Sequence, residues 1–279
     1  MHECRQARLR ALNQIPHSME YNTIPEDLLD KDDLPLTDPE EHHHMSQSKS
    51  LALNLFKWVQ INEGDPAVDV RPTFLCFKPA NIWSNQQFYH KVTSHLIGRL
   101  LLDGLHVGPL DQAQFLLLNN RIYAHKTLRI NFTTYDNRRD QDTIKPHAHS
   151  DVMMLSRDNT HPYCYARVIG IFHAMVQLNS PRSRNRDLHR IEFLWVRWYE
   201  VDEKARVGFK ANRQFQLKFR TGSQAFGFVN PANVLRAVHL ISNFHKSTTT
   251  RFLGPSIARR SDENNEDYYR FYVNMWVTY

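Results

Sequence analysis

Two short pairs of nitrogen and sulfur donors lie near the middle of the sequence. His147 and His149 are one residue apart, and His161 and Cys164 are two residues apart. Imidazole nitrogen and thiolate sulfur are the usual ligands of tetrahedral zinc, so the pairs could together close a metal site. A proline adjoins each pair, which predicts loops whose histidines cap and hydrogen-bond instead. We therefore expect no metal or other cofactor, with zinc at these four residues as the alternative.

Carboxylates form a second group that could do chemistry. Asp136, Asp140 and Asp142 lie close together in the sequence, and Glu192 follows later. Magnesium-dependent nucleases use such carboxylates to hold a metal ion against phosphate. Arginine and lysine are interleaved with the three aspartates, and opposite charges this dense usually pair on a loop surface. We therefore expect no catalytic residue, with a nuclease site at these four carboxylates as the alternative.

Other catalytic signatures are absent from the sequence. It has no glycine-rich phosphate loop, no G-x-S-x-G and no H-E-x-x-H, and its nine glycines leave little material for a nucleotide-binding loop. Three scattered cysteines are too few for a disulfide framework, which favours an intracellular protein. Cys164 lies within an aromatic, strand-like stretch, where an inert buried thiol is expected.

The net charge of +6 combines two opposite parts. Residues 1–44 contain four Lys and Arg against ten Asp and Glu, whereas residues 45–279 contain 31 against 19. A soluble basic face is the common explanation of such an excess. It also suits a polyanion or an acidic protein as partner.

The N-terminal half is predicted to hold the helices. Residues 1–45 are rich in proline and acidic residues and lack periodicity, which predicts an extended, largely disordered acidic arm. Residues 46–120 are predicted to be a helical region, with one amphipathic helix over 46–62 and another from Ser84 to Gly104. The longest apolar runs are only a few residues, such as FLLL at 115–118, so no membrane span is expected.

Beyond residue 121 the hydrophobic period changes to two, which predicts strands. Asn230 and Pro231 predict a short helix that begins with an asparagine cap. The fold class expected is α+β, with a β-barrel-like, mostly antiparallel domain over 121–279 behind the helical region and the acidic arm. The alternating strands are expected at 127–135, 213–219 and 268–277, and central strands with two apolar faces at 163–173 and 191–200.

Long stretches of this part resemble a family of uncharacterised proteins from mushroom-forming fungi that are associated with Kyakuja-Dileera-Zisupton-type transposons. The resemblance covers residues 46–277 and implies a transposon origin. In that family the position of Cys164 is usually occupied by Trp and that of His147 by a residue other than His. Residues 71–87 look like an insertion relative to the family. The stretches are RIYAHKTLRINFTTYDNRRDQDTIKPHAHSDVMML, HPYCYARVIGIFHAMV, IEFLWVRWYE, FGFVNPANVLRAVHLISNF, LGPSIAR and YYRFYVNMWV.

The same part also resembles the bromo-adjacent homology domain. Four stretches follow one another in that family's order: DVMML at 151–155, YARVIGIF at 165–172, WVRWYE at 195–200 and VLRAVHLI at 234–241. The resemblance implies a β-rich, non-enzymatic module that binds histone tails, nucleosomes or other chromatin proteins. Glu200-Val201-Asp202-Glu203 replaces the family's usual tail after the Trp-Tyr pair.

Some members of that family hold methylated lysine in an aromatic cage, where ring faces attract the ammonium group. Successive strand residues face opposite sides, so Trp195 and Trp198 cannot share a face and at least one is expected in the core. The candidate binding residues are the aromatic Tyr163, Tyr165, Trp198 and Tyr199 and the loop arginines Arg182, Arg184, Arg186 and Arg190.

The sequence thus supports three functions. The first is a non-enzymatic interaction module of transposon origin, intracellular and acting in the nucleus, that binds chromatin or nucleic acid through a basic, aromatic-lined β-barrel surface. The second is a metal-dependent nuclease or transposase fragment that uses the four carboxylates. The third is a degenerate gene product without activity.

Overall fold

The protein is described by a computed structural model. The chain divides into two units, residues 1–35 and residues 36–279, and every described residue belongs to the second unit. The structure describes residues 41–46, 50–68, 86–101, 107–134, 138–146, 148–156, 161–202, 215–245, 247–260 and 263–274.

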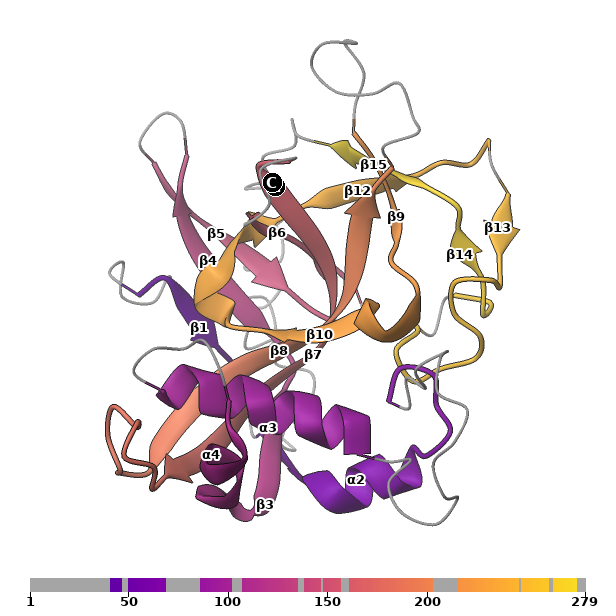
Figure 1. The fold of residues 1–279 in the computed structure, drawn as a ribbon. Coiled ribbons are helices and arrows are strands. Elements are labelled where there is room, and N and C mark those ends of the chain that lie inside the picture. Colours follow the sequence, from indigo (N-terminus) through magenta and orange to yellow (C-terminus); the bar gives the residue numbers. More distant parts are fainter. Residues whose placement is uncertain are drawn as a thin grey trace, which may run out of the picture. The chain divides into compact units, whose positions relative to one another are not determined.

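Antiparallel strands make up most of this unit, and every strand pair in the described residues is antiparallel (Figure 1). The protein is therefore mostly antiparallel β-sheet with a few short helices, as the period-two patterns predict. The strands are β1 His43–Met45, β2 Leu51–Asn54, β3 Phe115–His125, β4 Leu128–Thr133, β5 Arg139–Ile144, β6 Asp151–Leu155, β7 Tyr163–Leu178, β8 His189–Val201, β9 Gln216–Phe219, β10 Phe226–Val229, β11 Val234–Ala237, β12 His239–Ser242, β13 Thr248–Thr249, β14 Asp267–Tyr268 and β15 Phe271–Asn274. The helices are α2 Leu55–Ile61, α3 Gln86–Leu100 and α4 Pro109–Ala113, with 3₁₀ turns η3 Gly222–Gln224 and η4 Pro231–Asn233.

The main sheet follows the order β11-β6-β7-β8-β9-β15-β12. Strand β10 pairs with β8, β3 with β7, and β2 with β3. No ladder joins the two ends of this path within the described strands. The end strands β11 and β12 are nevertheless separated only by Val238, whose N–H donates to the Asp151 carbonyl at 2.9 Å. The chain therefore passes from one end of the sheet to the other in a single residue.

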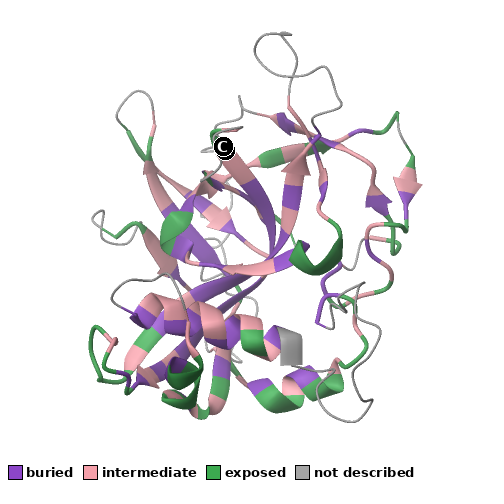
Figure 2. Ribbon diagram, in the orientation of Figure 1, coloured by how far each residue is buried: buried purple, intermediate pink, exposed green. Residues whose placement is uncertain are grey.

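Strands β7 and β8 are the longest of the described strands and form the centre of the sheet. Side chains are buried on both of their faces, which confirms the prediction of central strands at 163–173 and 191–200 (Figure 2). On its other edge, β7 pairs first with β6 and then with β3.

The helices cover one face of the lower half of this sheet (Figure 1). Trp58 of α2 and Phe88 of α3 pack on Trp195 of β8, with ring centroids 5.8 and 5.2 Å away. The predicted apolar stripe of α3 is buried, as expected: it consists of Phe88, Val92, Leu96 and Leu100. Among the described residues, no helix is both long and apolar enough to span a membrane.

The predicted helix over 46–62 is wrong in its first half. Residues 51–54 form β2, which pairs with residues 121–124 of β3, and Leu51 is exposed rather than part of a buried stripe. The helix begins only at Leu55, after the cap residue Asn54, whose side chain accepts from the Lys57 N–H at 3.0 Å. The pairing with a distant strand overrides the local helical period.

Two further boundaries differ from the prediction. Residues 43–45, placed at the end of the disordered arm, form β1 and pair with residues 128–130 of β4, which also pairs with β5. The region predicted to be helical also includes β2 and the start of β3 at Phe115. Residues 1–40 and 69–85 lie outside the described residues, and so does most of the apparent insertion at 71–87.

The remaining predicted elements are close to the observed ones. The strand predicted at 213–219 is described from Gln216 as β9, and the one at 268–277 as β14 and β15 up to Asn274. The asparagine cap is confirmed, because Asn230 Oδ1 accepts from the Ala232 N–H at 3.1 Å at the start of η4.

Candidate functional site

The loop between β7 and β8, residues 179–188, is anchored to the helical face by two of its arginines. Arg182 Nη1 donates to Asp111 Oδ2 at 3.0 Å, and Asp111 also accepts from Ser180 Oγ at 2.7 Å. The hydrogen bond from Ser180, then that from the Gly108 N–H, lowers the pKa of Asp111. Arg184 Nε donates to the Leu101 carbonyl at 3.1 Å. Since these bonds tie it to α3 and α4, the loop is held in one arrangement.

The outer part of the same hairpin presents cationic side chains to solvent. Arg184, Arg186 and Arg190 are all exposed. The Arg186 carbonyl accepts from Gln177 Nε2 at 2.7 Å, which fixes its backbone and leaves the guanidinium outside. Arg190 Nη2 donates to Glu192 Oε1 at 2.9 Å. We call Arg184, Arg186 and Arg190 the basic hairpin.

The structure corrects the aromatic part of the predicted site. Tyr165 and Tyr199 are 1% and 3% exposed and lie in the core, so neither can contribute to an aromatic surface. Tyr199 Oη donates to Asp151 Oδ1 at 2.9 Å. Tyr163 and Trp198 are partly buried against two different core clusters. Trp195 lies in a third cluster under the helices, which confirms that Trp195 and Trp198 face opposite sides.

The four predicted carboxylates do not form a site in the described part of the chain, where no three acidic, histidine or cysteine side chains converge as metal ligands. Asp136 lies outside the described residues. Asp140 and Asp142 both lie on β5, and Asp142 Oδ2 accepts from the Ala237 N–H at 2.8 Å. Burial raises the pKa of Asp142, and Arg236, 3.4 Å away, opposes this shift.

The four predicted zinc ligands have other surroundings. His147 lies outside the described residues, and His149 is exposed on the turn that follows β5. His161 Nδ1 contacts the Tyr163 carbonyl at 2.7 Å, and Cys164 Sγ donates to the Leu155 carbonyl at 3.6 Å. The His161 contact matches the capping role expected from the sequence. The expectation of a buried thiol is wrong, because Cys164 is only half-buried.

A histidine pair that sequence reasoning missed lies where β3 meets β7. His125 Nε2 and His173 Nδ1 are 2.6 Å apart, and Tyr123 stacks on His173 with 4.7 Å between ring centroids. His125 Nδ1 lies 3.2 Å from the Ser46 carbonyl, which can only accept. The Nδ1 of His125 therefore carries the proton, and its Nε2 accepts from His173 Nδ1.

The surroundings of this pair keep it neutral. Burial, followed by the charge of Arg190, lowers the pKa of His173 to about 4, and burial also lowers the pKa of His125. Glu192 opposes both shifts, and its Oε2 lies 3.3 Å from Nε2 of His43 on β1. The alternation of His125 with Tyr123 on one strand was visible in the sequence, but only the β3–β7 register brings His173 beside them.

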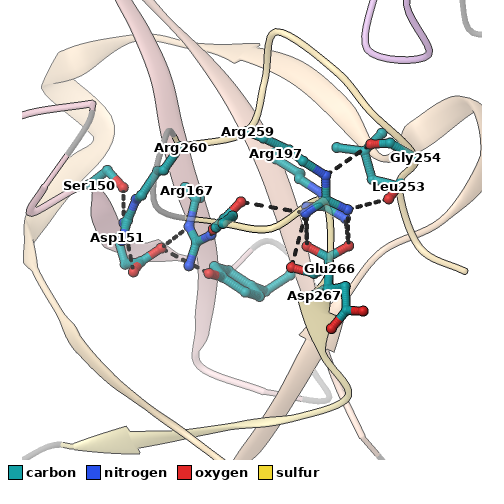
Figure 3. A network of polar contacts seen from close by, with 12 residues as sticks. Ser150, Asp151, Arg167, Arg197, Leu253, Gly254, Arg259, Arg260, Glu266 and Asp267 are labelled. Atoms are coloured by element: carbon teal, nitrogen blue, oxygen red, sulfur yellow. Dashed lines mark hydrogen bonds and ion pairs between the residues drawn. The ribbon is translucent and has the colours of Figure 1, made fainter. Parts of the chain in front are cut away.

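Several arginines counted in the basic excess lie inside the protein (Figure 3). Arg167 and Arg197 are opposite each other on β7 and β8. Arg167 Nε donates to Asp151 Oδ1 at 3.0 Å, and its guanidinium lies 5.0 Å from the centroid of Phe219. Arg259 Nη1 and Nη2 reach the two oxygens of Asp267 at 3.2 Å. This network fastens Arg259 and Asp267 onto the sheet, which is a structural role.

Comparison with known proteins gives no family assignment. No protein-family model matches the chain. A search of curated proteins finds no similar sequence either.

Proposed function

We propose that this protein is a non-enzymatic module that binds nucleic acid, free or packaged in chromatin, through the basic hairpin. The observation that carries the proposal is the exposure of Arg184 and Arg186 on the loop and of Arg190 at the start of β8. The loop backbone is held by the hydrogen bond from the Arg184 N–H to the Leu100 carbonyl of α3 and by the one from Gln177 to the Arg186 carbonyl. Guanidinium groups bind phosphate oxygens with two parallel hydrogen bonds, and a fixed loop loses little freedom on binding.

The sign of the charge separates the two kinds of chromatin partner. Histone tails are rich in lysine and arginine, so a cationic loop repels them, whereas the DNA backbone attracts it. The burial of Tyr165 and Tyr199 also removes half of the aromatic residues that a methyl-lysine cage would need. The proposed ligand is therefore the phosphate backbone of DNA or RNA, rather than a histone tail.

The strand order supports a barrel-like module of the bromo-adjacent homology type. The four stretches that carry the resemblance fall on β6, β7, β8 and the pair β11–β12. The single-residue link at Val238 joins the two ends of the sheet path, as a strand shared by both edges of a barrel would. We infer a barrel-like arrangement and, with the fungal family, a transposon origin. The nuclease alternative has less support, because Asp142 is already bonded to Ala237 and Arg236.

The proposal is tested by titrating the full chain into a fluorescein-labelled DNA duplex and following its anisotropy at several salt concentrations. The double variant Arg186→Gln/Arg190→Gln removes two charges from the hairpin. We expect at least about tenfold weaker binding at low salt. The slope of log K against log salt should fall by about 1.8 if each arginine contacts one phosphate.

The matched control is Lys57→Gln/Arg251→Gln, which removes two exposed charges outside the hairpin. This control should bind much as the wild type does. If both variants bound DNA equally weakly, the affinity would depend on net charge and not on the hairpin. No DNA binding by the wild type at low salt would refute the proposal. Tight binding of histone peptides without DNA binding would show that the ligand is a histone tail rather than nucleic acid.

A further inference from the structure

The edge of β7 that faces β3 and β6 contains a gap. Its ladder with β6 ends at Arg167, and its ladder with β3 begins at Ile171. Between them lie Val168, whose N–H donates to the Ser150 carbonyl at 2.8 Å, and then Ile169 and Gly170, where the register with β8 also shifts. Within the described strands, nothing pairs with Ile169 or Gly170 on this edge.

A pocket of about 310 Å³ opens at this gap. This volume falls at the lower end of the range for small-molecule sites, which are mostly apolar with a few polar groups. The walls come from β2, α2, β3, β7 and β8. The lining residues are Leu53, Trp58, Asn62, Ala124, His125, Pro146, Ile169, Gly170, Ile171, Phe172, Trp195 and Ile257.

Among the described residues that line the pocket there is no aspartate, glutamate, lysine or arginine. His125, the one histidine among these described lining residues, has its two ring nitrogens directed at Ser46 and His173 and is held neutral by burial. A charged occupant would lose its hydration here without gaining a counter-charge. The pocket therefore selects a neutral molecule.

The walls are suited to a ring. Trp58 and Trp195 pack edge to face, with 5.8 Å between centroids and an interplanar angle of 88°. Aromatic rings bind such walls in offset or edge-to-face geometry. Asn62 lies on the same wall, and its Nδ2 donates to the Trp58 carbonyl at 2.8 Å, which orients the side-chain amide. The amide and the peptide groups of Ile169 and Gly170 can bond one polar group on the ring.

We propose that this pocket binds a neutral, aromatic small molecule of about the size of indole that carries a hydrogen-bonding group. The site is separate from the basic hairpin, because none of the three hairpin arginines lines it. The proposed ligand site can therefore be tested independently of nucleic-acid binding.

The test uses the full chain and three probes of similar shape: indole, the cation tryptamine and the anion indole-3-acetate. Saturation-transfer NMR detects binding, and calorimetry gives the dissociation constants. We expect indole to bind with a dissociation constant below about 1 mM, and each charged analogue to bind at least about tenfold more weakly.

Two variants fill the pocket from different sides. Ala124→Leu adds volume at the wall, and Ile257→Trp blocks the site from a partly exposed position that tolerates a larger side chain. Both should weaken indole binding by about tenfold or more, whereas Ala113→Leu on α4, outside the lining, should not. If Ala124→Leu fails to fold, indole binding by the Ile257→Trp variant tests the proposal alone. No binding of indole, equal binding of the charged analogues, or undiminished binding by folded Ile257→Trp would overturn the proposal.

Discussion

Arg197 and Asp267 form a bidentate ion pair inside the protein. Nη1 and Nη2 of Arg197 lie 2.8 Å from Oδ1 and Oδ2 of Asp267, and the side chains are only 2% and 0% exposed. The Arg197 guanidinium also lies 3.6 Å from the centroid of Phe219. The pair joins the central strand β8 to β14, which is far away in the sequence. Because both side chains are buried, water does not screen the attraction between their charges.

Asp267→Asn should lower the free energy of unfolding by about 3–5 kcal/mol, because it leaves Arg197 and Arg259 buried with one fewer counter-charge. Urea unfolding followed by circular dichroism measures this change. The control is Glu200→Gln, which breaks the exposed pair with Lys218 and should cost no more than about 1 kcal/mol. Similar small losses in both variants would contradict a structural role for the buried pair.

The histidine pair should make stability depend on pH. The folded protein holds His173 neutral, with a pKa of about 4, whereas an unfolded histidine titrates near 6.5. Between these values the unfolded chain binds a proton that the folded protein does not. Stability should therefore be constant with respect to this group above pH 6.5 and fall as the pH falls toward 4, by about 3 kcal/mol for His173. His95, whose pKa burial also lowers to about 4, changes stability in the same direction.

Urea unfolding at pH 7, 5.5 and 4 tests this dependence. His173→Phe keeps a ring beside Tyr123 and should flatten the loss between pH 6.5 and 4. The exposed His245 supplies the control, His245→Asn, which should leave the pH dependence as in the wild type. An unchanged dependence in His173→Phe would show that other groups, such as His95 or the carboxylates, account for it.

Gly227→Ala should destabilise the pairing of β10 with β8. A β-carbon at this position would lie 2.6 Å from Nε1 of Trp198, so the indole would have to move. The expected cost is about 1–3 kcal/mol in urea unfolding. Trp198→Phe in the same chain should recover part of it. Gly254→Ala, whose β-carbon meets nothing within 4 Å, is the matched control, and an equal loss there would rule out the proposed clash.

Asn54→Ala should cost about 1 kcal/mol, because it removes the side-chain acceptor from the first turn of α2. Asn54→Asp keeps an acceptor and should retain most of the stability. Thermal unfolding of the two variants measures the difference. If both lost the same stability, the cap would not be the cause.

Local patterns predicted those elements whose burial follows their own sequence. The stripe of α3, the two central strands and the Asn230 cap all depend on neighbours within a few residues or on a continuous apolar run. Strand β2 was predicted as helix because Leu51, Leu55 and Val59 have helical spacing. Its pairing with β3 is a contact between distant residues, and no local period encodes it.

The candidate site was predicted less well than the fold, for two physical reasons. Residue type does not reveal on which side of a two-faced strand a side chain lies, so the buried Tyr165 and Tyr199 were expected at the surface. Charge counts likewise include arginines that the interior neutralises, such as Arg167 and Arg197. The pair of His125 and His173 depends on strand register, which the sequence does not show.

The one-residue link between β11 and β12 has a consequence for folding during synthesis. Strand β12 pairs with β15, and β15 also pairs with β9. The strands nearer the N-terminus leave the ribosome first, but this end of the sheet can pair only after residues 271–274 of β15 have emerged. Until they emerge, β9 and β12 have no β15 to bond, and the nascent chain presents edges to which other chains can add. Among the described strands, β15 is thus the one whose arrival covers the open edge of β9.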